Sequence, residues 1–429
     1  MSRGWTVALA LFALVGCAPI SHAADIAGTW TGTWTKNGDA LPVGVTFLRS
    51  DGGVSGSFDS DALQVAGIPF RQVSYAPPNV HFVLAGDAST STFDGTLKGD
   101  VVEGTFVEGE ARGSFRLIRT PAAQPAIQAR EITFNNGDVK LAGTLLLPSA
   151  AGPHPAIVFL HGSGAEGRWA NRYLAERFAK AGFAALIYDK RGVGQSTGDW
   201  HNAGFEELAG DALAGIRFLQ ARPEVDKMKI GIYGHSQGGT LAPLVAARAE
   251  DLAFIIGSAA GGIDPAAMEE YSVGNSIGIS ALPPDEAADA RSFVHAIVDV
   301  AYRGKPRKDL DAVAVRFRNR AWYFSPPPAD DYYWSFARRI AAYRPTDYWR
   351  QAKAPVLLLF GNKDERVPPA ESSRAIVAAL RQGGNKAVTL RVFPNADHTF
   401  SLPTPNGGWP KHVQNYATIM IVWAREKTK

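Results

Sequence analysis

The chain has 429 residues, of which 46% are hydrophobic and 20% are charged. This length exceeds one typical domain of about 100–200 residues and predicts two or three folded units, and the composition excludes a wholly disordered chain. The 44 lysines and arginines exceed the 41 aspartates and glutamates by only three, and no run of five like charges occurs. We therefore expect no nucleic-acid partner.

The N-terminus carries an apolar stretch, in which Arg3 precedes the uncharged segment 5–15. Eleven residues are too few to span about 30 Å of hydrocarbon, so residues 1–24 are predicted to be an export signal. The sequence before Cys17, the sole cysteine, resembles a bacterial lipobox, and Ser21-His22-Ala23 offers an ordinary cleavage site. We expect an exported protein that is periplasmic, secreted or an outer-membrane lipoprotein anchored through a lipidated Cys17, with no internal disulfide.

Residues 25–120 contain short apolar–polar alternations separated by glycines, for example 28–34 and 92–97. An alternation of period two is typical of strands with one buried face. Asp51-Gly52 and Gly99-Asp100 supply the turn residues that antiparallel hairpins need. We therefore predict a small antiparallel all-β domain, a barrel or a sandwich, with about eight strands.

Residues 121–130 have two prolines and no apolar alternation, and are predicted to be a linker. From residue 131 to residue 429 strand patterns alternate with helical patterns, beginning with a hairpin around Asn136-Gly137. The further strands are predicted at 156–160, 184–188, 229–233, 253–256, 356–360 and 388–393, and the helices at 169–181, 205–220, 240–249, 370–380 and 411–424. This order predicts a mostly parallel sheet with helices on both faces, interrupted at about 262–350 by a helical cap insert.

The motif Gly-x-Ser-x-Gly is typical of a nucleophilic serine on a sharp turn between a strand and a helix. It occurs three times, around Ser196, Ser236 and Ser276. Only Ser236 follows an apolar strand pattern, at 229–233, and precedes a helical one, at 240–247. We therefore predict that Ser236 is the nucleophile and that the other two are loop serines.

A serine hydroxyl becomes an effective nucleophile when an imidazole accepts its proton and a carboxylate orients that imidazole. His398 follows the last predicted strand, in a loop that the topology places at the carboxyl edge of the sheet, near Ser236. Asp364 follows the preceding strand in the same way. We predict His398 as the base and Asp364 as the acid, with His412 and Glu365 as the respective alternatives.

The tetrahedral intermediate of acyl transfer carries an oxyanion, which needs donors that are already in place. One predicted donor is the backbone N–H of Gln237, at the start of the helix. The second is the backbone N–H of Ser163, in the glycine-rich loop His161-Gly162-Ser163-Gly164 after the first parallel strand. This chemistry implies no metal and no cofactor.

The segment from about residue 130 to residue 429 resembles the α/β-hydrolase superfamily. It carries the His-Gly-Ser-Gly loop at 161–164, the serine turn at 234–239, a late Asp and a final His in the superfamily's order. The string 189–196 looks like the superfamily's structural Asp-x-Arg-Gly-x-Gly-x-Ser turn. The chain is most similar to exported bacterial carboxylesterases with a β-rich N-terminal domain. The resemblance implies an eight-stranded core and ester hydrolysis.

We therefore expect a serine hydrolase that cleaves small acyl or aromatic esters through an acyl-enzyme. The alternatives are a thioesterase or acyltransferase with the same triad, and a non-catalytic protein that binds its ligand through the β domain. Aromatic residues in the insert either line an acyl pocket or form the core of the cap, and both interpretations stay open. They are Trp322, Tyr323, Phe324, Tyr332, Tyr333, Trp334, Phe336, Tyr343, Tyr348 and Trp349.

Overall fold

The computed structural model describes five stretches of the chain, residues 25–85, 89–121, 126–249, 251–404 and 408–429. The export signal predicted at residues 1–24, with Cys17, lies outside the described residues. Export and lipidation therefore stay predictions. Within the five stretches no helix is long and apolar enough to cross a bilayer.

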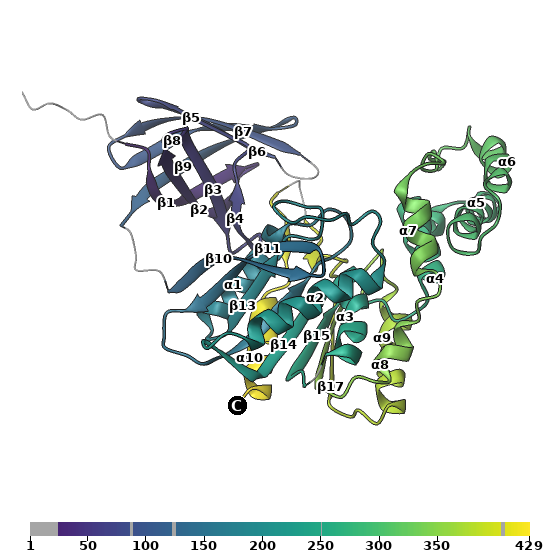
Figure 1. Ribbon diagram of the computed structural model, residues 1–429. Coiled ribbons are helices and arrows are strands. Elements are labelled where there is room, and N and C mark those ends of the chain that lie inside the picture. Colours follow the sequence, from purple (N-terminus) through teal and green to yellow (C-terminus); the bar gives the residue numbers. More distant parts are fainter. Residues whose placement is uncertain (1–24, 86–88, 122–125, 250, 405–407) are drawn as a thin grey trace, which may run out of the picture.

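The N-terminal domain is a single nine-stranded antiparallel sheet that curls into a half-barrel (Figure 1). Its strands, in chain order, are β1 (Gly28–Lys36), β2 (Asp39–Ser50), β3 (Gly53–Ser60), β4 (Val65–Pro69), β5 (Gln72–Ala76), β6 (Asn79–Ala85), β7 (Thr90–Lys98), β8 (Val101–Glu108) and β9 (Ala111–Thr120). Their order across the sheet is β4-β3-β2-β1-β9-β8-β7-β6-β5. Between β4 and β5, the N–H of Phe70 donates to Gly56 of β3, and the N–H of Arg71 donates to Val83 of β6. The predicted antiparallel β domain is confirmed.

Aromatic rings fill the inside of the half-barrel. Trp30 and Trp34 lie four positions apart on β1, hence on one face of the strand, and both are buried. The ring centroid of Trp34 lies 4.7 Å from that of Phe58 and 4.5 Å from that of Phe93. Phe93 in turn stacks on Phe82 at 4.5 Å. The two tryptophans therefore belong to the core of this domain.

A tryptophan from the other end of the chain completes this core. The ring of Trp409 is buried against Trp34 and Phe106, at centroid distances of 6.4 and 6.0 Å. Its backbone N–H donates to the Asp39 carboxylate and its indole N–H to the Asp39 carbonyl oxygen, both at 3.1 Å. The Lys36 ammonium lies 4.2 Å from the ring centroid. Trp409 therefore joins the half-barrel to the second domain.

The second domain is built on an eight-stranded sheet with the order β10-β11-β13-β12-β14-β15-β16-β17. The strands are β10 (Ile127–Asn136), β11 (Val139–Pro148), β12 (His154–Leu160), β13 (Ala184–Tyr188), β14 (Val225–His235), β15 (Phe254–Ser258), β16 (Val356–Gly361) and β17 (Val388–Phe393). The pairs β10–β11 and β11–β13 are antiparallel, and all other neighbours are parallel. The predicted mostly parallel sheet is confirmed.

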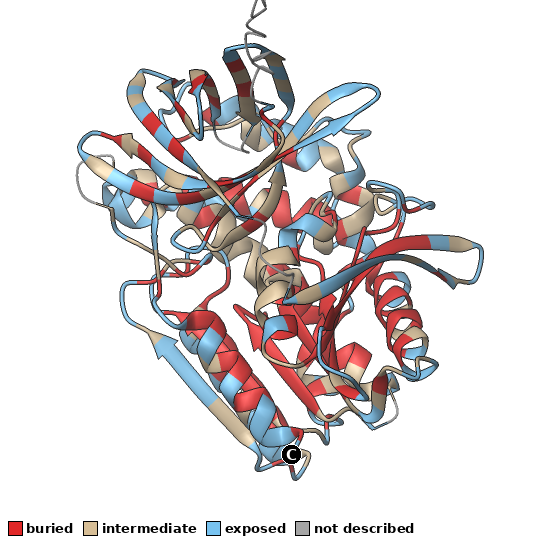
Figure 2. Cartoon of the chain, turned by 90° about the vertical axis from the view of Figure 1, so that its left-hand side faces the viewer, coloured by how far each residue is buried: buried red, intermediate tan, exposed pale blue. Residues whose placement is uncertain are grey.

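Helices cover both faces of this sheet (Figure 1). They are α1 (Arg172–Lys180), α2 (Phe205–Gln220), α3 (Gln237–Arg248), α8 (Pro345–Trp349), α9 (Pro369–Gln382) and α10 (Tyr416–Lys427). Alternate residues of β16 belong to the cores on the two faces. Leu358 lies in the core that includes α2, α3, α8 and α9, whereas Leu357 and Leu359 lie in the core that includes α1 and α10. Figure 2 shows the result, with buried residues gathered on the strands and on the inward faces of the helices.

Several element boundaries differ from the predictions, and two of the differences have a clear cause. β10 begins at Ile127 and pairs with β11 along its whole length, so it overlaps the end of the predicted linker 121–130. As an exposed edge strand it lacks the apolar alternation that marks a half-buried one. The last helix begins at Tyr416 and not at 411, because β19 (Lys411–His412) pairs with β18 (Ser401–Leu402).

The insert forms helices α4 (Pro265–Ser276), α5 (Pro284–Tyr302), α6 (Arg307–Phe317) and α7 (Tyr332–Ile340), which project from the sheet domain (Figure 1). Most of its aromatic residues are core residues. Five contribute to the cluster inside the cap, namely Trp322, Tyr323, Phe324, Tyr333 and Trp334. Four others pack with the core of the sheet domain, namely Phe336, Tyr343, Tyr348 and Trp349. The insert therefore has a hydrophobic core of its own.

We predict that Trp409→Ala separates the unfolding of the two domains. The substitution removes a buried ring, a change that costs about 3–5 kcal/mol in protein cores. Differential scanning calorimetry should then show the half-barrel unfolding at a lower temperature than the sheet domain. The control is Trp169→Ala, because Trp169 is 46% exposed. A Trp409→Ala profile identical to that of the unmodified chain would contradict the assigned role.

Candidate active site

Ser236 occupies the sharp turn between β14 and α3, at the carboxyl edge of the sheet. Its backbone has φ of 55° and ψ of −118°, a strained combination that residues other than glycine rarely adopt. A Cβ at Gly234 would lie 2.2 Å from the carbonyl oxygen of Gly238, and a Cβ at Gly238 would lie 2.8 Å from that of His161. Both positions therefore require glycine, and α3 begins in direct contact with the end of β12.

The side chains of Ser236, His398 and Asp364 form one continuous chain of contacts. Nε2 of His398 lies 2.9 Å from Oγ of Ser236, and Nδ1 lies 3.0 and 2.9 Å from the two carboxylate oxygens of Asp364. Both Asp364 and His398 are buried, at 1% and 5% exposure. The three residues follow β14, β16 and β17, so the structure brings together the three side chains that the sequence analysis selected.

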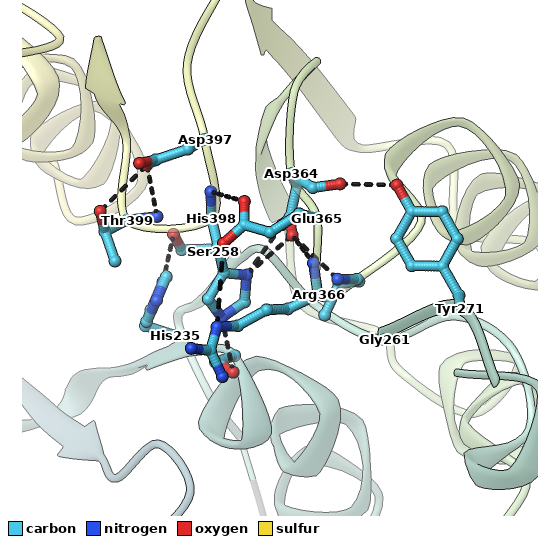
Figure 3. A network of polar contacts seen from close by, with 12 residues as sticks. His235, Ser258, Gly261, Tyr271, Asp364, Glu365, Arg366, Asp397, His398 and Thr399 are labelled. Atoms are coloured by element: carbon cyan, nitrogen blue, oxygen red, sulfur yellow. Dashed lines mark hydrogen bonds and ion pairs between the residues drawn. The ribbon is translucent and has the colours of Figure 1, made fainter. Parts of the chain in front are cut away.

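The loop that carries Asp364 is held from two sides. Its Oδ1 accepts hydrogen bonds from the backbone N–H groups of Arg366 and Val367, both at 2.8 Å. From the cap, the hydroxyl of Tyr271 on α4 donates to the carbonyl oxygen of Asp364 at 2.6 Å (Figure 3). The carboxylate therefore has little freedom to turn away from His398, and the cap is attached directly to the acid loop.

The two alternative residues have other partners. The Glu365 carboxylate contacts the backbone N–H of His398 at 3.4 Å, and it does not contact the ring. His412 lies on β19, where its Nδ1 contacts Oγ of Ser401 at 3.3 Å. Neither residue therefore stands in the position of Asp364 or His398.

A second histidine packs against the ring of His398. The ring centroids of His235 and His398 lie 4.9 Å apart (Figure 3). Burial, reinforced by the charge that His398 can carry, lowers the pKa of His235 to about 3. Nδ1 of His235 contacts Oγ of Ser258 at 3.2 Å, and this Oγ lies 2.5 Å from the hydroxyl oxygen of Tyr416. His235 is therefore neutral, and it does not repel a proton held on His398.

Both predicted oxyanion donors lie beside Ser236. Gln237 is the first residue of α3, where backbone N–H groups have no acceptor within the helix. Ser163 lies in the loop after β12, in which Gly164 has φ of 81°. Gln237, Ser163 and Ser236 line one cavity of about 220 Å³. This placement suits two backbone donors to an anionic oxygen formed next to Ser236.

The cavity lies between the sheet domain and the cap. Its other lining residues are Phe205, Thr240, Pro265, Met268, Glu269, Ser272, Tyr302, Phe336, Ile340, Arg366 and Val367. Its walls combine apolar and polar side chains in similar numbers. Among the ten aromatic residues that the sequence offers for the pocket or the cap core, Phe336 lines the cavity, so the pocket interpretation holds for that ring.

Glu269 is a cavity residue that the sequence analysis missed. One oxygen of its carboxylate accepts a hydrogen bond from the Tyr333 hydroxyl at 2.9 Å. Burial raises the pKa of Glu269, and the Tyr333 hydrogen bond only partly offsets this effect. The sequence carries no motif around Glu269, because its burial depends on how the cap helices pack onto the sheet.

The two other motif serines have structural roles. The Ser196 hydroxyl donates to the carbonyl oxygen of Asp189 at 2.7 Å and accepts from the N–H of Ala142 at 2.9 Å, in a buried setting. The Ser276 hydroxyl donates to the carbonyl oxygen of Val273 at 2.8 Å, at the end of α4. The structure places neither one beside an imidazole. Within the described residues, no group of three or more His, Cys, Asp or Glu side chains is arranged to hold a metal ion.

The fold and this arrangement of a turn serine, an imidazole and a carboxylate define the protein as an α/β-hydrolase. The model of the family described as serine aminopeptidase, S33, matches residues 151–402, more than half of the chain, and the chain belongs to that family. The matched segment includes Ser236, Asp364 and His398.

Individual relatives match smaller parts. Esterase EstD of Thermotoga maritima is 23% identical over 281 residues, which are 64% of this chain and 60% of EstD. Quorum-quenching protein AidA of Acinetobacter baumannii is 31% identical over 127 residues, which are 29% of this chain and 42% of AidA. The chain thus covers less than two thirds of either relative. Among solved structures, the Pyrococcus furiosus esterase PF2001 aligns with a TM-score of 0.47 and 16% identity, over 72% of this chain and 97% of that chain.

We predict that Ser196→Ala lowers stability without affecting the reaction at Ser236. The substitution leaves the buried N–H of Ala142 without its acceptor, which costs about 1–3 kcal/mol. The melting temperature should fall while kcat for an ester substrate stays within twofold. A loss of kcat larger than tenfold in folded protein would refute the structural assignment.

Proposed function

We propose that the protein hydrolyses carboxylic esters through a covalent acyl-enzyme on Ser236. The observation that carries the proposal is the unbroken contact from Asp364 through His398 to Ser236, at the wall of a cavity that apolar and polar side chains line together. A relative named as an esterase aligns over 64% of the chain, which supports the same reaction class. The size of the cavity favours small acyl or aromatic esters.

In the first half of the reaction, Oγ of Ser236 attacks the acyl carbon and its proton passes to Nε2 of His398. Asp364 accepts the Nδ1–H of His398, fixes the tautomer and stabilises the imidazolium. The N–H groups of Gln237 and Ser163 bind the oxyanion of the tetrahedral intermediate. The bond to the alcohol oxygen then breaks, and the alcohol leaves with the proton from Nε2.

In the second half, water attacks the acyl carbon of the acyl-enzyme and gives one proton to Nε2 of His398. The second tetrahedral intermediate uses the same two backbone donors. Its collapse releases the carboxylic acid and returns the proton to Oγ of Ser236. A thioesterase or an acyltransferase would use the same steps with a thiol leaving group or with an alcohol in place of water.

We predict that Ser236→Ala lowers kcat for p-nitrophenyl acetate by about four to six orders of magnitude, because the covalent route is lost. Ser276→Ala, which changes an equivalent motif serine away from the cavity, should keep the unmodified rate. Labelling by a fluorophosphonate should disappear in Ser236→Ala only. Retained turnover in Ser236→Ala would refute the nucleophile, and absence of labelling in the unmodified chain would favour the non-catalytic alternative.

A second candidate reaction is hydrolysis of the amide bond after a free N-terminal amino acid. The family is described as serine aminopeptidase, and the Glu269 carboxylate lies in the wall of the cavity that holds Ser236. A half-buried carboxylate with one hydroxyl donor can still accept a hydrogen bond from a protonated amine. This observation favours an acyl group that carries an ammonium.

We predict that Glu269→Gln separates the two candidates. A charge-assisted hydrogen bond contributes about 1.5–3 kcal/mol, so kcat/KM for L-alanine p-nitroanilide should fall about 10- to 150-fold if the ammonium binds Glu269. The value for p-nitrophenyl acetate, which has no amine, should change by less than threefold. If the unmodified chain cleaves the acetate and leaves the anilide intact, the aminopeptidase candidate is rejected.

A further inference from the structure

A buried cation lies beneath the loop that carries Ser163. The side chain of Lys190 is only 2% exposed. Its Nζ donates to the carbonyl oxygens of Gly162 and Gly164, both at 2.6 Å. The two carbonyls lie on either side of Ser163 in the sequence, so a single ammonium holds both ends of the segment.

The contact between Lys190 and the Gly162 carbonyl also fixes the direction of the Ser163 N–H. The carbonyl of Gly162 and the N–H of Ser163 belong to one peptide group, which is planar and trans. In a trans peptide the C=O and N–H bonds point in opposite directions. Because the Gly162 carbonyl points at the Lys190 ammonium, the Ser163 N–H points away from it.

The same loop is fixed by Glu166. Its carboxylate accepts the N–H of Gly162 at 2.6 Å, and its own backbone N–H donates to Gly164 at 3.0 Å. The N–H of Lys190 donates to the Glu166 carbonyl oxygen at 3.2 Å, which attaches the loop to the segment after β13. Glu166 therefore holds the peptide groups before and after the Gly162–Ser163 peptide, Lys190 holds that peptide itself, and Ser163 lines the cavity.

We propose that Lys190 is a positioning residue for the oxyanion hole: it fixes the Gly162–Ser163 peptide so that the Ser163 N–H faces the cavity. The inference rests on the proposed function, because it requires an oxyanion beside Ser236. The ammonium also withdraws electron density from the Gly162 carbonyl, which makes the attached N–H a stronger donor. An uncharged side chain of similar length would fill the space without this effect.

The charge on Lys190 depends on pH within the working range. Burial lowers the pKa of Lys190 to about 8, and the nearby Glu166 carboxylate opposes part of that effect. His161, which also faces Lys190, has its pKa lowered to about 3 by burial and is neutral, and the Asp189 carboxylate is bound to Arg168. The ammonium is therefore present below about pH 8 and is lost as the pH rises through this value.

The test compares Lys190→Met with Lys353→Met, using p-nitrophenyl acetate as substrate. Lys353 also donates to a backbone carbonyl, that of Gly383 at 3.1 Å, but it is exposed. For Lys190→Met we expect kcat to fall about 10- to 100-fold, because a donor displaced by about 1 Å loses that much. KM should stay within threefold, because the oxyanion is absent from the ground state. Lys353→Met should match the unmodified chain.

A transition-state analogue separates positioning from general loosening of the structure. Phenyl trifluoromethyl ketone adds to an active serine and places an oxyanion in the hole, so its inhibition constant should rise by the same factor as kcat falls. If Lys190→Met binds this ketone as tightly as the unmodified chain, or changes KM and leaves kcat intact, the proposal is overturned.

The pH profile of the unmodified chain tests the proposal even if Lys190→Met does not fold. The kcat should decline as the pH rises through about 8, and a kcat that stays flat from pH 7 to pH 10 overturns the proposed role of the charge. If the proposed ester hydrolysis through Ser236 is itself wrong, Ser236→Ala will be as active as the unmodified chain, and this result distinguishes the two failures. Loss of activity in Ser236→Ala together with full activity in Lys190→Met rejects only the role of Lys190.

Discussion

The direct contact between α3 and the end of β12 is the constraint on which the site depends. Because Gly234 and Gly238 have no side chains, the first turn of α3 rests against the backbone of His161, and this sets Ser236 beside the loop of Ser163. Ser236 and the Gln237 donor are therefore positioned by main-chain packing, whereas the loop of Ser163 is also held by the side chains of Lys190 and Glu166. Only the imidazole and its carboxylate have to be brought in, and they arrive on the loops after β17 and β16.

The parts of this arrangement that depend on local pattern could be predicted from the sequence. Strand β13 and helix α2 match the predicted ranges at both ends, because their hydrophobic periods continue without interruption to a turn signal. Ser236 was distinguished from the other motif serines by the strand and helix on either side of it. His398 and Asp364 followed from topology, because parallel strands present their carboxyl ends at one edge.

The parts that depend on long-range packing could not be predicted. In the sequence, nothing distinguishes Glu269 from other acidic residues, because its place in the cavity depends on the packing of the cap on the sheet. Lys190, within the turn motif 189–196, resembles a surface lysine. The hydrogen bond from Tyr271 to the Asp364 loop spans 93 positions, which no spacing rule connects. The sequence shows the many aromatic residues of the insert, but only the packing decides which of them form a core and which line the pocket. Most of them pack either in the core of the cap or in that of the sheet domain.

The position of Trp409 has a consequence for how the chain is made. The ring follows the end of β9 at Thr120 by 409 − 120 = 289 residues. At about 5–20 residues per second, the ribosome needs about 15–60 s to add them, and the half-barrel lacks one of its interior rings throughout that delay. Until the second domain has been made, the rings of Trp34 and Phe106 in the nascent first domain therefore lack the ring that packs against them in the folded protein.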